Sequence, residues 1–357
     1  MMLPPWRTLA RIRLAVNAGP CHERGDRMDR SLGRGLCMSI LACALIATTL
    51  PEAAETDLSI ITPPAVLPLE VPRPIEPRGR AFLSSYRLPD TMTFAGDPVP
   101  IQMWQVRERI EYEFYRFLED EGDSIILAKR TGRCFPTAER QLAEAGMPDD
   151  LKYILLVESK CISAAYSRAK ASGPWQFIPS TGRLFSLTNN DWKDDRRNLE
   201  LSTEAAIKYL KRLHGIFNDW PLAMASYNAG EIHILKSMRE QRVQDYWKLH
   251  YVTETMRYVP RVMAVKEIFS QPEKYLGLAK SDLYTPLDTE IVTVNVKDKQ
   301  RHLASVAEEY GTYFLELKLL NPEIRKDYLP RGTHRLKIPR RKDDGCPVGC
   351  YKADIPR

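Results

Sequence analysis

Apolar residues in the middle of the chain recur every three or four positions, which is the period of an amphipathic helix. Charged and polar residues fill the positions between them, so each segment can turn one apolar face toward a core. Strand-like alternation is nearly absent up to Tyr275, and the main domain is therefore predicted to be mostly α. The predicted helices cover residues 104–120, 138–146, 149–160, 201–217, 221–229 and 255–270.

Two of these segments begin with residues that typically cap helices. Asp149 or Asp150 is expected to cap the third predicted helix, because a carboxylate at this position can accept a bond from the free backbone N–H groups. Ser202 and Thr203 precede a glutamate at the start of the fourth helix, and this order is typical of a helix cap.

One carboxylate lies on the apolar stripe of its own predicted helix. In ILLVESKC, Ile154 and Leu155 follow Leu151 at the spacing of one helical face. The next position on that face, seven residues after Leu151, is Glu158. A carboxyl in apolar surroundings either finds a partner or keeps its proton, and its pKa rises toward the range useful for acid catalysis. Glu158 is therefore the first candidate for chemistry.

The period changes near the C-terminus. After a linker at residues 277–289, the segment EIVTVNV alternates like a strand, two helical segments follow, and THRLKIP is again strand-like. The order predicts a β-α-α-β module over residues 290–339, which is large enough for a compact domain. Residues 101–276 then form the main domain, and residues 340–357 a tail.

The N-terminal part has the pattern of an export signal. Arginines precede an apolar run at residues 36–50 that is too short for a comfortable membrane span, and small residues follow it. These features predict a signal peptide over residues 28–54. Because a signal normally begins near its basic region, Met28 is a more natural start, and residues 1–27 are interpreted as a start-site extension. Residues 55–100 are rich in proline and are predicted to be a linker.

A second processing route is open at Cys43. The sequence ILAC ending at this cysteine resembles the lipid-attachment box of bacterial lipoproteins, although the apolar residues after it are atypical. Lipidation there would associate the protein with a membrane, whereas a plain signal peptide would not.

Four cysteines lie beyond the predicted signal peptide, and an even number in an exported chain suggests two disulfides. The close pair in CPVGC, Cys346 and Cys350, is expected to close a small loop, which leaves Cys134 with Cys161. No cysteine spacing is typical of zinc and the six histidines are scattered, so neither a metal nor a cofactor is expected.

The net charge of the 357-residue chain is +6, which raises the question of a nucleic-acid partner. Residues 1–50 hold seven arginines, no lysine and three acidic residues, so they carry about +4 of that charge. The remaining chain is close to neutral, and no polyanion is expected as a partner.

The segment that follows Glu158 combines small, turn-forming and aromatic residues. In ASGPWQFIPSTG (171–182), Gly173 lets the backbone approach a ligand closely, while Trp175 offers an apolar face and Gln176 an amide. Neither a nucleophile elbow nor a phosphate-cradling glycine loop is present in the sequence. The composition of 171–182 favours a substrate groove beside Glu158.

Three motifs occur in order across about 150 residues: VESKCISAAYSRAKASGPWQFIPSTG, then ASYNAGE at 225–231 and ETMRYVPRVMA at 254–264. Together they resemble the lytic transglycosylases with a goose-lysozyme-like fold. The resemblance implies a peptidoglycan lyase that acts on glycan strands, without a cofactor, in the periplasm or cell envelope. Association with the outer membrane is a further option.

The resemblance assigns the chemistry to Glu158. As catalytic acid it would protonate the oxygen between N-acetylmuramic acid and N-acetylglucosamine, and then take the proton of the muramoyl 6-hydroxyl as that oxygen attacks C1. The expected product is a 1,6-anhydro sugar. The resemblance also implies substrate-binding roles for Ser167, Gln176, Tyr227, Asn228, Glu254 and Tyr258.

Two positions depart from the family. Lys170 stands where the family usually has glycine, and it can contact an acidic peptide stem or point into water. Cys161 stands where an aromatic residue is common. A disulfide to Cys134 would tie the end of the catalytic helix to an upstream helix and fix the direction of Glu158.

The C-terminal module at 290–339 resembles a LysM domain, a class that binds chains containing N-acetylglucosamine. Its first loop, KDKQRHL, departs from the usual turn of that class. Glycan binding and a purely structural spacer therefore both remain open for this module.

Two alternatives to the lyase stay open for the chain as a whole. The first is true hydrolysis of the same bond, as in goose-type lysozymes. The second is a non-catalytic scaffold that binds peptidoglycan and keeps the fold for localisation.

Overall fold

The computed structural model describes residue 83 and residues 85–340. The predicted mostly α fold class is confirmed: helices α2 to α10 make up more than half of the described part of the first domain, and one short hairpin of strands accompanies them there. Among the described residues, no helix is long and apolar enough to cross a lipid bilayer.

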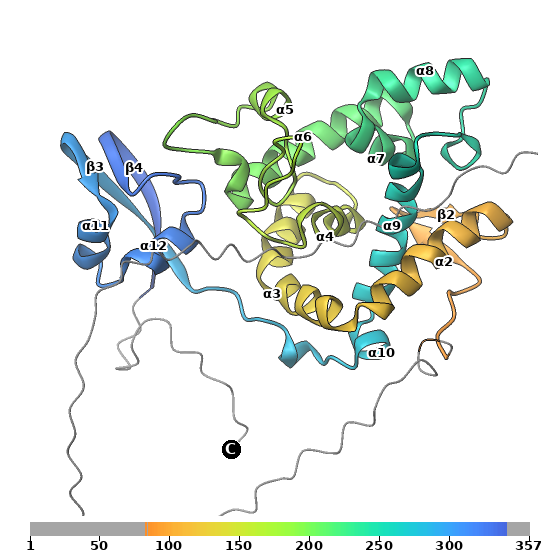
Figure 1. Cartoon of the computed structure of the whole chain (residues 1–357), viewed down its shortest axis with the longest axis horizontal. Coiled ribbons are helices and arrows are strands. Elements are labelled where there is room, and N and C mark those ends of the chain that lie inside the picture. Colours follow the sequence, from red (N-terminus) through yellow and green to blue (C-terminus); the bar gives the residue numbers. More distant parts are fainter. Residues whose placement is uncertain (1–82, 84, 341–357) are drawn as a thin grey trace, which may run out of the picture. The chain divides into compact units, whose positions relative to one another are not determined.

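The core of this domain is built around α9, Thr253–Phe269. Nearly every residue of α9 from Tyr258 onward is buried, as expected for a helix that is apolar on most of its circumference. Helix α2, Trp104–Glu119, packs along it, and α7 (Trp220–Ala229) and α4 (Ile154–Ser159) also contact it (Figure 1). Because α9 touches all of these helices, it fixes their mutual positions.

Helix α3 is longer than the sequence pattern predicted. It covers Glu121–Glu144, whereas the predicted segment began only at residue 138. Pro136 lies inside the helix, although an interior proline removes a backbone hydrogen bond. Asp120 caps the true start, where its carboxylate accepts a hydrogen bond from the backbone N–H of Asp123.

The predicted cap at Asp149 or Asp150 is wrong. The segment Asp149–Tyr153 is a 3₁₀ turn that begins after Pro148 without a side-chain cap. Asp149 instead forms an ion pair with Lys152, and Asp150 forms one with Lys266 of α9, both at 2.6 Å. Charge pairing across the fold therefore takes these carboxylates away from the helix end.

The predicted cap at Ser202 and Thr203 is also wrong. Helix α6, Leu199–Phe217, begins earlier, and Asn198 caps it by accepting a hydrogen bond from the backbone N–H of Leu201. Ser202 and Thr203 lie inside the helix, where their hydroxyls donate to backbone carbonyls one turn earlier. Serine and threonine hydroxyls form hydrogen bonds with backbone groups both at helix caps and inside helices. The sequence alone therefore does not distinguish a cap position from an interior one.

The end of the predicted linker 55–100 is folded. Residues Met92–Phe94 and Asp97–Val99 form an antiparallel hairpin, β1 and β2, and Leu88 is buried beside them in the main core. Pro98 is tolerated because the strand lies at a sheet edge. The prolines here belong to a packed segment, so the linker prediction is wrong for this part.

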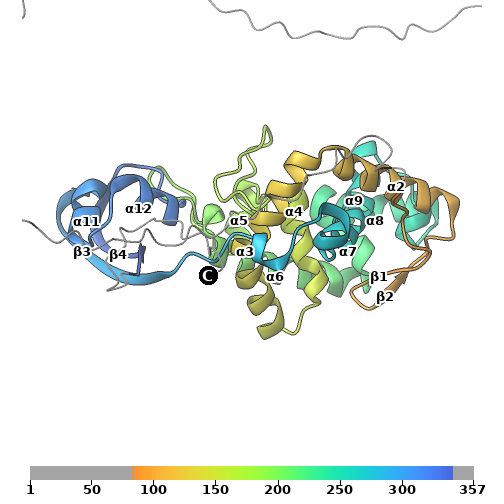
Figure 2. The same cartoon turned by 90° about the horizontal axis from the view of Figure 1, so that it is seen from below.

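The second domain has the predicted β-α-α-β order. Strands β3 (Thr289–His302) and β4 (Tyr328–Pro339) pair antiparallel over almost their whole length, and α11 and α12 lie against them (Figure 2). The core of this domain is a separate cluster that includes Val294, Leu303 and Leu336. We call residues 289–339 the LysM-like domain.

The remaining elements complete the chain order. They are α4 (Ile154–Ser159), α5 (Pro179–Leu184), α7 (Trp220–Ala229), α8 (Glu231–Gln241), α10 (Pro272–Leu276), α11 (Leu303–Glu309) and α12 (Phe314–Leu320), with 3₁₀ turns at Asp195–Arg197, Tyr246–Lys248 and Lys280–Asp282.

Several predictions fall outside the described residues. These are the start-site extension 1–27, the signal peptide 28–54, lipidation at Cys43 and the pairing of Cys346 with Cys350.

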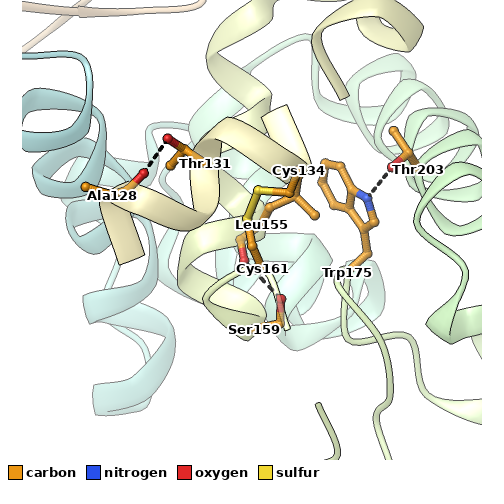
Figure 3. Close-up of a disulfide and its surroundings, with 8 residues drawn as sticks. All are labelled: Ala128, Thr131, Cys134, Leu155, Ser159, Cys161, Trp175 and Thr203. Carbon is orange, nitrogen blue, oxygen red and sulfur yellow. Dashed lines mark hydrogen bonds between the residues drawn. A yellow bond between two sulfur atoms is a disulfide. The ribbon is translucent and has the colours of Figure 1, made fainter. Parts of the chain in front are cut away.

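A disulfide joins Cys134 of α3 to Cys161, directly after α4, as the cysteine pattern predicted (Figure 3). In the same view the indole of Trp175 lies close by, and its Nε1 donates to Thr203 of α6 at 2.8 Å. The chain around α4 is therefore attached to α3 covalently, while the segment that follows is attached to α6 by a buried hydrogen bond.

We expect the double variant Cys134→Ala/Cys161→Ala to lose about 3.5 kcal/mol of unfolding free energy, because the cross-link spans 27 residues of chain. Denaturant unfolding of the variant and of the oxidised wild type measures the difference, with reduced wild type as the control. Rapid thiol labelling of Cys134 and Cys161 in the folded, unreduced protein, located by peptide mapping, would contradict the bond.

Candidate active site

Glu158 lies near the end of α4, a helix of only six residues. The helix stops because Lys160 and Cys161 both adopt left-handed backbone angles, with φ of 53° and 57°. Leu155 and Leu156 are buried in the core, whereas the side chain of Glu158 is half-buried. The carboxyl therefore stands at the border between the core and the surface, where it can meet a substrate.

The hydroxyl of Tyr258 donates a hydrogen bond to Glu158 Oε1 at 2.5 Å. Tyr258 comes from the first half of α9 and is itself buried, so its ring has little freedom to move. This contact joins two residues 100 positions apart in the sequence and fixes one oxygen of the carboxyl.

Burial raises the pKa of the Glu158 carboxyl to about 7. Three smaller effects act on the same pKa: the hydrogen bond from Tyr258 and the positive charge of Arg261 lower it, and the charge of Glu254 raises it. A pKa near 7 lets the group give up a proton and take one back at neutral pH.

Tyr227, on α7, stands close enough for the Glu158 charge to act on it. Burial and then that charge raise the pKa of the Tyr227 phenol well above its usual value, so the phenol stays neutral. Its hydroxyl donates to the backbone carbonyl of Trp175 at 2.7 Å. Tyr227 therefore links the 165–177 loop to the neighbourhood of the carboxyl.

Ser167 and Gln176 shape the loop of residues 165–177. Ser167 Oγ accepts a hydrogen bond from the backbone N–H of Ala171 at 3.1 Å. The amide of Gln176 donates to the carbonyls of Gly173 at 2.8 Å and Ala165 at 3.4 Å. The structure thus gives both side chains a role in folding the loop, and among the described residues no hydrogen bond joins either of them to Glu158.

Asn228 and Glu254 lie where α7 ends and α9 begins. Asn228 Oδ1 accepts a hydrogen bond from the hydroxyl of Thr255 at 3.2 Å, and Glu254 is exposed and bonded to Arg261 Nη1 at 3.0 Å. The structure therefore brings these two predicted residues near each other, and the charge of Glu254 reaches Glu158.

Two of the remaining predicted positions behave as packing or surface residues. Trp175 is fully buried, so its ring packs in the core. The side chain of Lys170 is exposed, whereas its backbone N–H donates to the carbonyl of Ser167 and its backbone carbonyl accepts from Arg196. Lys170 therefore points into water in this structure.

A buried ion cluster behind the site was missed at the level of sequence. Glu113 of α2 is 2% exposed and accepts hydrogen bonds from Arg257 Nε at 2.5 Å and from Arg261 Nε at 3.1 Å. The signal was present, because Glu113 lies on the apolar stripe of its helix as Glu158 does, and Arg257 and Arg261 share a face with Tyr258. The cluster sets the position and charge of Arg261.

Within the described part of the chain, no group of three or more histidine, cysteine, aspartate or glutamate side chains is arranged to hold a metal ion.

Comparison with known families gives two matches. Residues 135–250 match the transglycosylase SLT domain, and residues 290–345 match the LysM-like domain of lytic transglycosylase MltD. The first match contains Glu158, Gln176 and Tyr227, whereas Tyr258 lies beyond its end. The SLT match agrees with the fold that the sequence motifs imply.

The chain is 28% identical over 271 residues to membrane-bound lytic murein transglycosylase D of Escherichia coli (strain K12). That alignment covers 71% of the chain and 57% of the relative, so the chain spans 57% of the length of the protein it matches. Lytic transglycosylase Slt of Pseudomonas aeruginosa, solved as an inactive mutant, is 23% identical with a TM-score of 0.33, over 42% of this chain and 26% of that one. The 70 kDa soluble lytic transglycosylase of E. coli gives 19% identity and the same TM-score and coverage.

We expect Tyr258→Phe to raise the pKa of Glu158 above 7, because the lost hydrogen bond stabilises the ionised carboxyl. Carboxyl carbon NMR of glutamate-labelled protein measures this pKa, with the Glu158→Gln variant assigning the signal. Tyr313→Phe, which removes a hydroxyl from an exposed ring in the other domain, is the matched control. An unchanged or lower pKa in Tyr258→Phe would contradict the assignment.

We also expect Glu158→Gln to gain stability over the wild type as the pH rises. The folded pKa of about 7 exceeds the unfolded value of 4.5, so between these values the folded state holds a proton that the unfolded chain has lost. Wild-type stability therefore falls through this window, and the glutamine variant escapes the loss. Denaturant unfolding should show a difference that grows by roughly 2 kcal/mol from pH 4 to pH 8. A constant difference would count against the raised pKa.

Proposed function

Because the chain carries a transglycosylase SLT domain and a LysM-like domain of the MltD type, we propose that it is a peptidoglycan lytic transglycosylase. The bond cleaved is the β-1,4 link between N-acetylmuramic acid and N-acetylglucosamine, and the product carries a 1,6-anhydro-N-acetylmuramic acid end. Glu158 supplies the proton transfer for both halves of the reaction.

In the first half, protonated Glu158 gives its proton to the glycosidic oxygen, the bond from that oxygen to muramoyl C1 breaks, and the N-acetylglucosamine side leaves as an alcohol. Positive charge develops at C1. The hydroxyl of Tyr258 stabilises the carboxylate that remains on Glu158, since a hydrogen bond to a charged oxygen is stronger than one to a neutral acid.

In the second half, the carboxylate of Glu158 takes the proton of the muramoyl 6-hydroxyl while that oxygen forms a bond to C1. Glu158 is then protonated again and no water has been consumed. The nucleophile belongs to the substrate, so the mechanism does not need the second carboxylate that retaining and inverting glycosidases use. Glu254, the acidic residue whose charge reaches Glu158, is exposed and paired with Arg261.

The single observation that carries the proposal is the half-buried Glu158 with a pKa of about 7 and one oxygen held by Tyr258 at 2.5 Å. A carboxyl with a pKa of this size can act first as acid and then as base near neutral pH. An exposed glutamate could not serve as the acid there.

The other predicted site residues receive roles that fit their positions. Ser167 and Gln176 shape the loop on which the sugar rests. The side-chain amide nitrogen of Gln176 is bonded within the loop, and its side-chain oxygen accepts a hydrogen bond from a sugar hydroxyl or amide. Tyr227 holds that loop near Glu158, while Asn228 and Glu254 bound the opposite end of the site. The substrate is the glycan strand of peptidoglycan, reached after export to the periplasm or cell envelope.

Glu158→Gln should lower the rate of turbidity loss of purified sacculi by at least roughly 1,000-fold, because the amide keeps the shape but cannot give and recover a proton. Binding to sacculi should be unchanged. Mass spectrometry of wild-type digests should show muropeptides with anhydro ends.

Glu144→Gln, on the exposed surface of α3, is the matched control and should keep full activity. Normal activity in Glu158→Gln would overturn the catalytic assignment. Products with reducing muramoyl ends would instead identify a hydrolase, and sacculus binding by the wild type without any cleavage would identify a scaffold.

A further inference from the structure

A short strip of the helical domain pairs with the LysM-like domain through backbone hydrogen bonds. The N–H of Asp194 donates to the carbonyl of Glu323, and the N–H of Arg325 donates to the carbonyl of Trp192, both at 2.8 Å. Lys193 and Ile324 between them form an antiparallel bridge. We call residues 192–194 and 323–325 the docking strip. Its two sides pair like a pair of short strands.

Side chains close the two edges of the docking strip. Trp192 packs against the core of the LysM-like domain, with its ring edge-on to His334 at 5.1 Å between centroids. Glu323 is 6% exposed, and its Oε1 accepts a hydrogen bond from the side chain of Asn198, which also caps α6. Burying this carboxyl costs desolvation free energy when the domains dock, and the hydrogen bond that Asn198 donates to it across the two domains offsets part of that cost.

An ion pair between the domains lies beside the docking strip. Lys337 of β4 meets the carboxylate of Glu200 at the start of α6, with distances of 2.6 and 2.5 Å to its two oxygens. Both side chains are partly shielded from water. Asn198 and Glu200 both lie at the N-terminal end of α6. This end of the helix therefore contacts the second domain through two side chains.

The docking strip leads directly to a buried ion pair. Asp194 and Arg196 are 1% and 3% exposed, and two parallel hydrogen bonds of 2.8 Å join them. Such a bidentate pair has one well-defined geometry. The backbone of Asp194 is hydrogen-bonded to Glu323. The second domain therefore helps to position Asp194, whose carboxylate binds Arg196.

Arg196 in turn holds the 165–177 loop. Its Nη1 donates to the carbonyls of Lys170 and Phe177, each at 2.8 Å, on the two sides of the loop. Gly173 packs so closely on the Arg196 backbone that an added Cβ would lie 1.7 Å from the Arg196 carbonyl oxygen. The loop therefore contacts Arg196 at three positions, at Lys170, Gly173 and Phe177.

We propose that the LysM-like domain is a fixed part of the catalytic unit and that its docking on residues 192–200 holds the 165–177 loop in place through Arg196. Arg196 acts as a positioning residue, because it contacts the loop and has no hydrogen bond to Glu158. The domain thereby contributes to the site whether or not it binds glycan. Only the expected effect on turnover rests on the proposed function.

The test uses the full exported chain with the double variant Trp192→Ala/Lys337→Glu. This variant removes the Trp192 ring and places a negative charge opposite Glu200. Asp194, Arg196 and the 165–177 loop keep their own residues. Hydrogen exchange of the Asp194 and Arg325 amides reports docking, since both bond across the docking strip. Exchange of the Ser172 and Gly173 amides reports the loop, because both are bonded within it.

We expect the docking amides and the loop amides to exchange roughly tenfold faster or more, while the amides of α9 keep wild-type protection. kcat on a soluble glycan fragment should fall by roughly tenfold or more, because a shifted loop misplaces the sugar at Glu158. Loop amides within twofold of the wild type would overturn the proposal, and so would docking amides that stay protected.

Charge rescue and a matched control separate docking from general damage. Lys337→Glu alone should show the same changes in weaker form, and Glu200→Lys/Lys337→Glu should restore wild-type exchange. Arg335→Glu, an exposed charge reversal on the same strand, should exchange like the wild type. A swap that fails to restore the Lys337→Glu changes, or an equal effect of Arg335→Glu, would also overturn the proposal.

The exchange readout needs no catalysis, so the two conclusions can fail separately. Faster loop exchange in a protein that never cleaves peptidoglycan would refute the proposed function and leave the docking role standing. Full cleavage by the wild type with unchanged loop exchange in the undocked variant would do the reverse.

Discussion

A carboxyl group keeps its proton near neutral pH only where protein replaces the water around it, and this requirement shapes the structure around Glu158. Burial alone would raise the pKa of the carboxyl further and leave it a poor proton donor, because the charged form would be too costly. The hydroxyl of Tyr258 offsets part of that cost by donating to the charged oxygen. The pKa of about 7 reflects burial as the largest effect, opposed by this hydrogen bond and by the charge of Arg261, with a small increase from the charge of Glu254. Glu158 lies close to the left-handed end of the short helix α4, and the disulfide at Cys161 ties that end to α3.

Helix α9 combines two tasks that usually belong to different elements. Its apolar residues form the centre of the core, and one face near its start presents Glu254, Arg257, Tyr258 and Arg261 at helical spacing. Glu113 holds the two arginines from α2, so the charge that Glu158 senses depends on how α2 packs. Electrostatics of the site and stability of the domain are therefore coupled through one interface.

The sequence predicted those features that depend on neighbours along the chain. The helical period, the carboxylate on an apolar stripe and the β-α-α-β order are all local patterns, and they led to the mostly α fold and to Glu158. Features that depend on distant partners were missed or misread. Glu113 meets arginines more than 140 positions away, Asp150 was read as a cap although it pairs with Lys266, and residues 88–99 looked like linker because their core contacts come from later helices. Most assignments in the site came from family motifs, since spacing alone does not reveal which groups meet in space.

The close approach at Gly173 divides the 165–177 loop into an inner and an outer side. At the inner side, a φ of +86° and the nearby Arg196 carbonyl leave no room for a side chain, so substitution there would displace the whole loop. At the outer side, the side chains of Tyr166, Arg168 and Lys170 are exposed, although the backbone of Lys170 also has a positive φ, of 62°. Substitution of the exposed side chains at Tyr166 and Arg168 can therefore alter what the loop presents to its surroundings without displacing the backbone that Arg196 supports.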